Sequence, residues 1–102
     1  MSHQIRFTEE ARADLQRLYD LLLQQAPPDL ETAERALTEI SQTIALLETT
    51  PFSCRKAEPR NPFLRELVIG FGTSGYVALF EIDDDQTVTI LAVRNQREDD
   101  YY

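Results

Sequence analysis

The sequence predicts an α+β domain in the order β-α-α-β-β-β, in which a helical hairpin packs on a small antiparallel sheet. Apolar residues recur every three or four positions in the first half of the chain and every second position in the second half. A length of 102 residues fits one domain, residues 1–102, because two smaller units would bury too little apolar surface to be stable without staples.

The chain begins with a predicted short strand. From His3 to Phe7 the residues alternate, with Ile5 and Phe7 on one side and Gln4 and Arg6 on the other. This period of two is typical of a strand with one buried face.

Two helices are predicted next. Thr8 offers an N-cap hydroxyl to the first helix, which Pro27 and Pro28 end, and Asp29 can cap the second, which Pro51 stops. The apolar stripe of each helix has helical spacing: Ala11, Leu15, Leu18 and Leu22 in the first, and Ala33, Leu37, Ile40, Ile44 and Leu47 in the second. The short connection predicts an antiparallel hairpin.

Three strands are predicted after a proline-containing loop that starts at Pro51. They are Leu64 to Ile69, Tyr76 to Ile82 and Thr87 to Arg94. The connections "GFGTSG" and "DDDQ" are short and rich in turn-forming residues, so we expect an antiparallel meander.

The charge distribution is uneven. With 18 acids against 10 Lys and Arg, the net charge of −8 repels phosphate backbones, so we expect no direct nucleic-acid binding. Four bases nevertheless accompany the single acid Glu58 between positions 55 and 65. They are Arg55, Lys56, Arg60 and Arg65. This segment is either a solvated loop or a contact patch for an acidic partner.

Several functional classes find no support in the sequence. Cys54 and His3 are the only residues of their types, so we expect no disulfide framework, no metal site and no cofactor. The "GFGTSG" segment connects two strands and precedes no helix, which argues against a phosphate-binding loop. No apolar run is long enough to span a membrane and the start lacks a signal peptide, so we expect a cytoplasmic protein.

Two leucines fall outside the apolar stripes. On a helical wheel, Leu23 lies roughly 110° from the centre of the first apolar face, and Leu46 lies roughly 140° from the centre of the second. We expect both to be at least partly exposed. Isolated exposed leucines are common, and the alternative is a second face of the hairpin that binds another chain.

The segments "FTEEARADLQRLYDLL", "LRELVIGFG", "GYVALFEIDDDQTVTILAV" and "RNQREDDYY" together resemble the RelE/ParE superfamily of bacterial type II toxin-antitoxin toxins. The likeness covers nearly the whole chain and is greatest for the ParE-like plasmid-stabilisation branch. It implies the β-α-α-β-β-β fold, a ParD-like antitoxin that wraps and neutralises the toxin, and one of two targets, DNA gyrase or mRNA on the ribosome. Leu23 and Leu46 then become candidate antitoxin-binding residues.

Two positions in the sequence help to decide between gyrase and mRNA as the target. Ribosome-dependent relatives commonly carry an Arg where this sequence has Val77, and a basic or imidazole group where it has Asn95. RNA cleavage needs cationic groups and proton carriers, and removing one preorganised donor typically costs on the order of 3 kcal/mol of transition-state stabilisation. The sequence therefore favours a gyrase inhibitor without catalytic residues, whose target-binding residues are Arg94, Arg97 and Tyr101.

Two alternatives stay open. One is an mRNA interferase that uses Arg65, Arg97 and Tyr101. The other is a non-toxic member that only binds an antitoxin, since Asn95 stands where close relatives often carry His.

Overall fold

The computed structural model describes residues 3–24, 29–72 and 74–96. Its order of elements confirms the α+β class. The elements are β1 (Gln4–Phe7), α1 (Glu9–Leu23), α2 (Leu30–Ala45), the 3-10 turns η1 (Leu46–Glu48) and η2 (Pro51–Ser53), β2 (Arg55–Glu58), β3 (Asn61–Phe71), β4 (Ser74–Ile82) and β5 (Thr87–Asn95).

The strands form one sheet in the order β1-β5-β4-β3-β2. The predicted meander is confirmed, since β3, β4 and β5 pair antiparallel. The sheet as a whole is mixed, because β1 pairs parallel with β5. No short turn joins β1 to its partner, so the direction of this pairing could not be inferred from local sequence.

The second difference is β2, which lies where the sequence predicted a loop. Arg55 pairs with Glu66 and Lys56 with Arg65, and an irregularity follows Lys56. The segment "RKAE" has no alternation of apolar and polar residues because it is an edge strand with little to bury.

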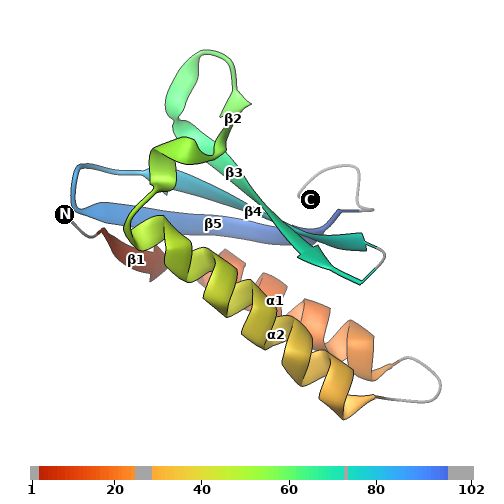
Figure 1. Ribbon diagram of the computed structural model, residues 1–102. Helices are drawn as coiled ribbons and strands as arrows, with labels where there is room; N and C mark the ends of the chain where they lie inside the picture. The colour runs from red at the N-terminus through yellow and green to blue at the C-terminus, as the bar shows by residue number, and fades with distance from the viewer. Residues whose placement is uncertain (1–2, 25–28, 73, 97–102) are drawn as a thin grey trace.

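Both helices cover the same face of the sheet and run antiparallel to each other (Figure 1). The core lies between these two layers and contains most residues of the predicted stripes, whereas Leu37 is half-buried and lines a surface hollow. Its buried residues include Ala11, Leu18, Ala36, Ile40, Ile44, Leu47, Ile69, Tyr76, Ala78, Phe80, Ile82, Val88, Ile90 and Val93. No helix in the described part of the chain is long and apolar enough to cross a membrane.

Both predicted N-caps are present. Thr8 Oγ1 accepts the Ala11 N–H at 3.0 Å, and the Asp29 carboxylate accepts the Thr32 N–H at 3.1 Å. The hydroxyl of Thr32 also donates to Asp29. This side-chain hydrogen bond and the one from the Thr32 backbone lower the pKa of Asp29.

The start of α1 is fastened to an irregular part of β5. Leu91 is an extra residue in the pairing with β4, since Leu79 faces Ala92 and Phe80 faces Ile90. The Thr8 N–H donates to the Ile90 carbonyl at 3.0 Å, and the Thr8 hydroxyl donates to the Leu91 carbonyl at 3.2 Å. These contacts fix the path of β5 toward its carboxyl end.

Candidate protein-binding surfaces

The end of β5 carries the first of the predicted target-binding residues. Arg94 lies directly opposite Val77 on β4, which in turn lies opposite Val68 on β3. Directly opposed residues point to the same face of a sheet, and this face is the one turned away from the helices. Val77 is only 2% exposed, so it presents no group to a substrate.

The Arg94 side chain is held close to its own strand. Its Nη1 donates to the Asn95 carbonyl at 3.3 Å, and its Nε is buried. Arg97 and Tyr101, the other two predicted target-binding residues, lie outside the described residues. The structure therefore describes one member of the predicted set.

Asn95 and Tyr76 lie opposite each other next to the Arg94–Val77 pair, and neither side chain exchanges protons readily at neutral pH. Asn95 is half-buried and faces Tyr76 across the β4–β5 pair, and a carboxamide does not titrate in the physiological range. Burial raises the pKa of the Tyr76 phenol above its ordinary value, and Tyr76 belongs to the core on the helical face of the sheet.

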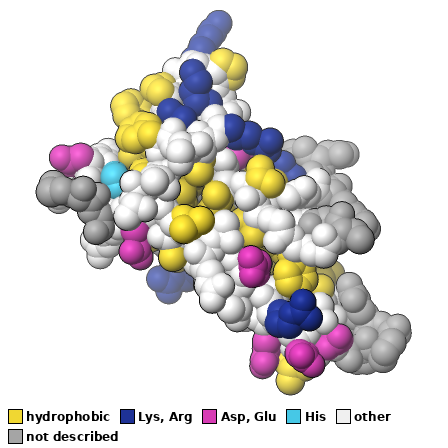
Figure 2. Space-filling model, viewed as in Figure 1, with side chains coloured by type: hydrophobic (Ala, Val, Ile, Leu, Met, Phe, Trp, Pro, Cys, Tyr) yellow, Lys and Arg dark blue, Asp and Glu magenta, His cyan; other side chains and the backbone are white. Residues whose placement is uncertain are grey.

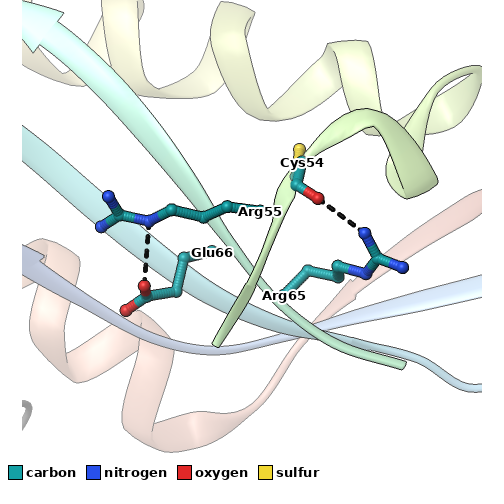
Figure 3. Close-up of polar contacts among 4 residues, drawn as sticks. All are labelled: Cys54, Arg55, Arg65 and Glu66. Carbon is teal, nitrogen blue, oxygen red and sulfur yellow. Dashed lines mark hydrogen bonds and ion pairs between the residues drawn. The ribbon is translucent and has the colours of Figure 1, made fainter. Parts of the chain in front are cut away.

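Arg65 of the predicted basic patch is bonded to the chain's own backbone. Its Nε donates to the Pro62 carbonyl at 2.7 Å, and its Nη1 donates to the Cys54 carbonyl at 2.7 Å and the Phe52 carbonyl at 3.2 Å. Its guanidinium also lies 5.3 Å from the centre of the Phe52 ring. Arg65 thus joins η2 to β3 (Figure 3).

The remaining bases of this patch do not share one face. Arg55 pairs with Glu66 through a 3.0 Å contact, on the face away from the helices. Lys56 lies opposite Arg65, on the other face. Figure 3 shows the Arg55 and Arg65 side chains pointing in different directions. Arg60 is exposed in the turn between β2 and β3.

Two exposed aromatic residues, which the sequence reasoning did not single out, lie beside this patch. Phe52 is 52% exposed and Phe63 is 51% exposed, and their rings meet edge to face with centroids 6.2 Å apart. Since Phe63 lies two residues before Arg65 on β3, both point to the helical face of the sheet. The available signal was the period of two along β3, which places Phe63 on the same face as Arg65, while Ala57 is the one apolar residue of the edge strand.

The helical hairpin presents the other candidate surface. Leu46 is 60% exposed and Leu23 is partly exposed, as their positions on the helical wheel predicted. Because the helices are antiparallel, these leucines lie at opposite ends of the hairpin. Between the helices lies a hollow of about 420 Å³, lined by Arg12, Leu15, Gln16, Tyr19, Leu37 and Ser41. The antitoxin-binding role of Leu23 and Leu46 stays a prediction.

A pair of acidic side chains lies near the β4–β5 turn. A hydrogen bond with Asp83, together with burial and the charge of Asp83, raises the pKa of Glu81. The hydroxyl of Thr89, which lies opposite Glu81, also donates to Asp83. Across residues 3–24, 29–72 and 74–96, no three metal-ligating side chains come together.

Comparison with protein-family models gives a match over residues 5–100 to the family described as "ParE toxin of type II toxin-antitoxin system, parDE". The chain belongs to the ParE toxin family. The resemblance inferred from the sequence segments is thereby confirmed. A search of the curated proteins finds no match.

The fold of this ParE family member is also found in a solved structure. A chain from the structure titled "Chromosomal ParDE TA system from P. aeruginosa" superimposes with a TM-score of 0.72. The match covers 92% of this chain and 96% of that one, at 20% sequence identity. At that identity the likeness supports the shared fold.

Proposed function

We propose that this ParE-family toxin inhibits DNA gyrase by protein-protein contact and performs no chemistry of its own. The observation that carries the proposal is that Arg65, the interferase candidate among the described residues, is bonded to the chain's own backbone. Arg94 lies on the face of the sheet away from the helices, opposite the buried Val77. Arg65 lies on the helical face and donates to backbone carbonyls.

The bonding of Arg65 to backbone carbonyls disfavours the interferase alternative, which uses Arg65, Arg97 and Tyr101. Cleavage by a 2′-hydroxyl needs a group that takes its proton, donors that stabilise the charged phosphorane and an acid for the leaving oxygen. The Nε and Nη1 of Arg65 already donate to backbone carbonyls, which leaves fewer donors for a phosphate. The net charge of −8 also opposes binding to the ribosome, whose surface is rich in phosphate.

The proposed gyrase-binding element is the end of β5 with the residues that follow it, namely Arg94, Arg97 and Tyr101. Arginine and tyrosine are enriched among the residues that dominate binding energy at protein interfaces. The bonds from Thr8 to β5 hold the strand that leads to this element, so less conformational freedom is lost on binding.

We propose that a ParD-like antitoxin neutralises the toxin by binding along the helical hairpin. An amphipathic helix of about 15 residues spans roughly 22 Å, similar to α1 itself, and so reaches from Leu23 to Leu46. The hollow between α1 and α2 is a second candidate contact for the antitoxin. It offers the apolar surfaces of Leu15 and Leu37 with a polar rim.

Expression of the toxin without its antitoxin tests this function in cells. We expect induction of the DNA-damage response while mRNA stays intact, because a gyrase poison traps double-strand breaks. Early loss of translation with cuts in ribosome-bound messages would favour the interferase. A folded protein that produces neither effect would favour the non-toxic alternative.

A further inference from the structure

We propose that the open edge of β2 binds an extended acidic segment of a partner protein, which adds to the sheet as a further strand. β2 is the last strand in the sheet order, and among the described residues it pairs with β3 alone. The other edge of an outer strand presents backbone N–H and C=O groups that a peptide can pair with. This inference does not depend on gyrase being the target.

Charge defines the partner. The edge carries Lys56 on the helical face and Arg55 on the other, and Arg60 follows in the turn. Glu58 is also exposed on β2, so positions 55 to 60 hold three bases and one acid. Within the described parts of the chain, neither Lys56 nor Arg60 makes an ion pair. In a protein of net charge −8, an acidic segment is repelled by most of the surface and attracted here.

Apolar surface next to the edge supplies an anchor. We call Phe52, Lys56, Arg60 and Phe63 the hairpin patch. Figure 2 shows hydrophobic and basic side chains gathered over the β2–β3 hairpin. The two phenylalanines are about half exposed. Arg65 stacks on Phe52 and bonds to its carbonyl, so the ring is ordered before a partner arrives.

A basic edge strand can also serve to prevent aggregation. Short edges, irregular pairing and Lys residues keep sheets from joining edge to edge, and β2 has all three. Prevention of aggregation does not explain the two half-exposed phenylalanines beside the edge, because exposed aromatic surface promotes association. The basic side chains therefore disfavour pairing of β2 with the β2 strand of a second copy, and they favour an acidic segment.

The pairing predicts the pattern of the bound segment. On an added strand, alternate side chains share the face that carries Lys56. An acidic side chain beside Lys56 and an apolar side chain two residues along, toward Phe52, would meet both parts of the hairpin patch. The segment should thus place acidic and apolar residues on the same face.

The test uses the full chain and a short fluorescent peptide, about the length of one strand of five or six residues, that carries Glu and Phe on one face. We expect saturable binding at low salt, with hydrogen-exchange protection at the amides of β2. The double variant Lys56→Glu, Arg60→Glu should weaken binding at least about tenfold, because it reverses both unpaired charges. The matched control, Arg6→Glu with Arg17→Glu, reverses two exposed charges on β1 and α1 and should leave binding within about twofold.

Three further measurements can overturn the proposal. An N-methylated peptide, which cannot donate backbone hydrogen bonds, should fail to bind, and equal binding would exclude strand addition. No binding of the unmodified peptide to the folded wild-type chain would exclude the site. Tighter binding of a single-stranded RNA of matched charge, lost in the same double variant, would assign the hairpin patch to nucleic acid instead.

Discussion

The Asp14 carboxylate on α1 accepts a hydrogen bond from the Val93 N–H on β5 at 2.9 Å, across 79 positions of the chain. Asp14 is 8% exposed and is the buried charged residue of the described core. It lies on the same helical face as Ala11 and Leu18. β1 pairs with β5 only as far as Ile90. Beyond that point, the Asp14 carboxylate accepts the backbone hydrogen bond of Val93 in place of a neighbouring strand.

Replacing Asp14 with Ala should lower the free energy of unfolding by about 1–3 kcal/mol, because a buried Val93 N–H loses its acceptor. Asp14→Asn keeps an acceptor oxygen and should cost less. Urea denaturation of the three proteins provides the comparison. Equal stability of the Ala variant and the wild type would show that water replaces the carboxylate without penalty.

Glu81 should make stability depend on pH. Its pKa is raised in the folded state by the hydrogen bond with Asp83, so the folded state binds this proton more tightly than the unfolded state. The resulting stability is fully present below the ordinary glutamate pKa and is lost as the pH rises through the raised value. Glu81→Gln should therefore be more stable than wild type at pH 7. The difference should vanish in thermal melts under acidic conditions. A constant difference at every pH would contradict the pairing.

Arg65 should contribute more to the stability of the fold than to the binding of a partner. Lys at this position has one ammonium group and cannot reach the carbonyls of Pro62, Cys54 and Phe52 together. Arg65→Lys should lower the free energy of unfolding by about 1 kcal/mol. The control Arg60→Lys lies in an exposed turn and should have no measurable effect. Equal effects of the two changes in urea denaturation would refute the structural role.

Leu46 should contribute to antitoxin binding and little to folding. It is 60% exposed, so Leu46→Asp should keep the circular dichroism spectrum of the wild type and weaken the complex with the antitoxin. Ile44, two residues earlier and 3% exposed, is the contrasting position, and Ile44→Asp should unfold the protein. Unchanged antitoxin affinity of the folded Leu46 variant would remove this residue from the proposed interface.

Most of the fold was predictable because its signals are local. Thr8 and Asp29 mark helix starts, and the two helical stripes and the alternation along β4 and β5 were read directly from the sequence. What was missed depends on contacts distant in sequence. The parallel partner of β1 and the edge strand β2 are of this kind.

The basic residues of the candidate binding surface could be predicted from the sequence, but the directions of their side chains could not. The excess of basic residues from Arg55 to Arg65 was visible, but whether each side chain faces solvent or the chain's own carbonyls depends on the register of β2 with β3. That register directs Arg65 to the Cys54 carbonyl and leaves Lys56 exposed. Asp14 was missed because an acid at a helical core position is unusual, although its spacing from Ala11 and Leu18 places it there.

A supercoiling assay with purified gyrase tests the central claim most directly. The account predicts that the wild-type toxin inhibits supercoiling and that Arg97→Ala with Tyr101→Ala abolishes this inhibition while the fold, followed by circular dichroism, survives. Antitoxin added before gyrase should prevent the inhibition. Full supercoiling activity in the presence of folded wild-type toxin, together with cleavage of mRNA on ribosomes by the same preparation, would contradict the account and favour the nuclease.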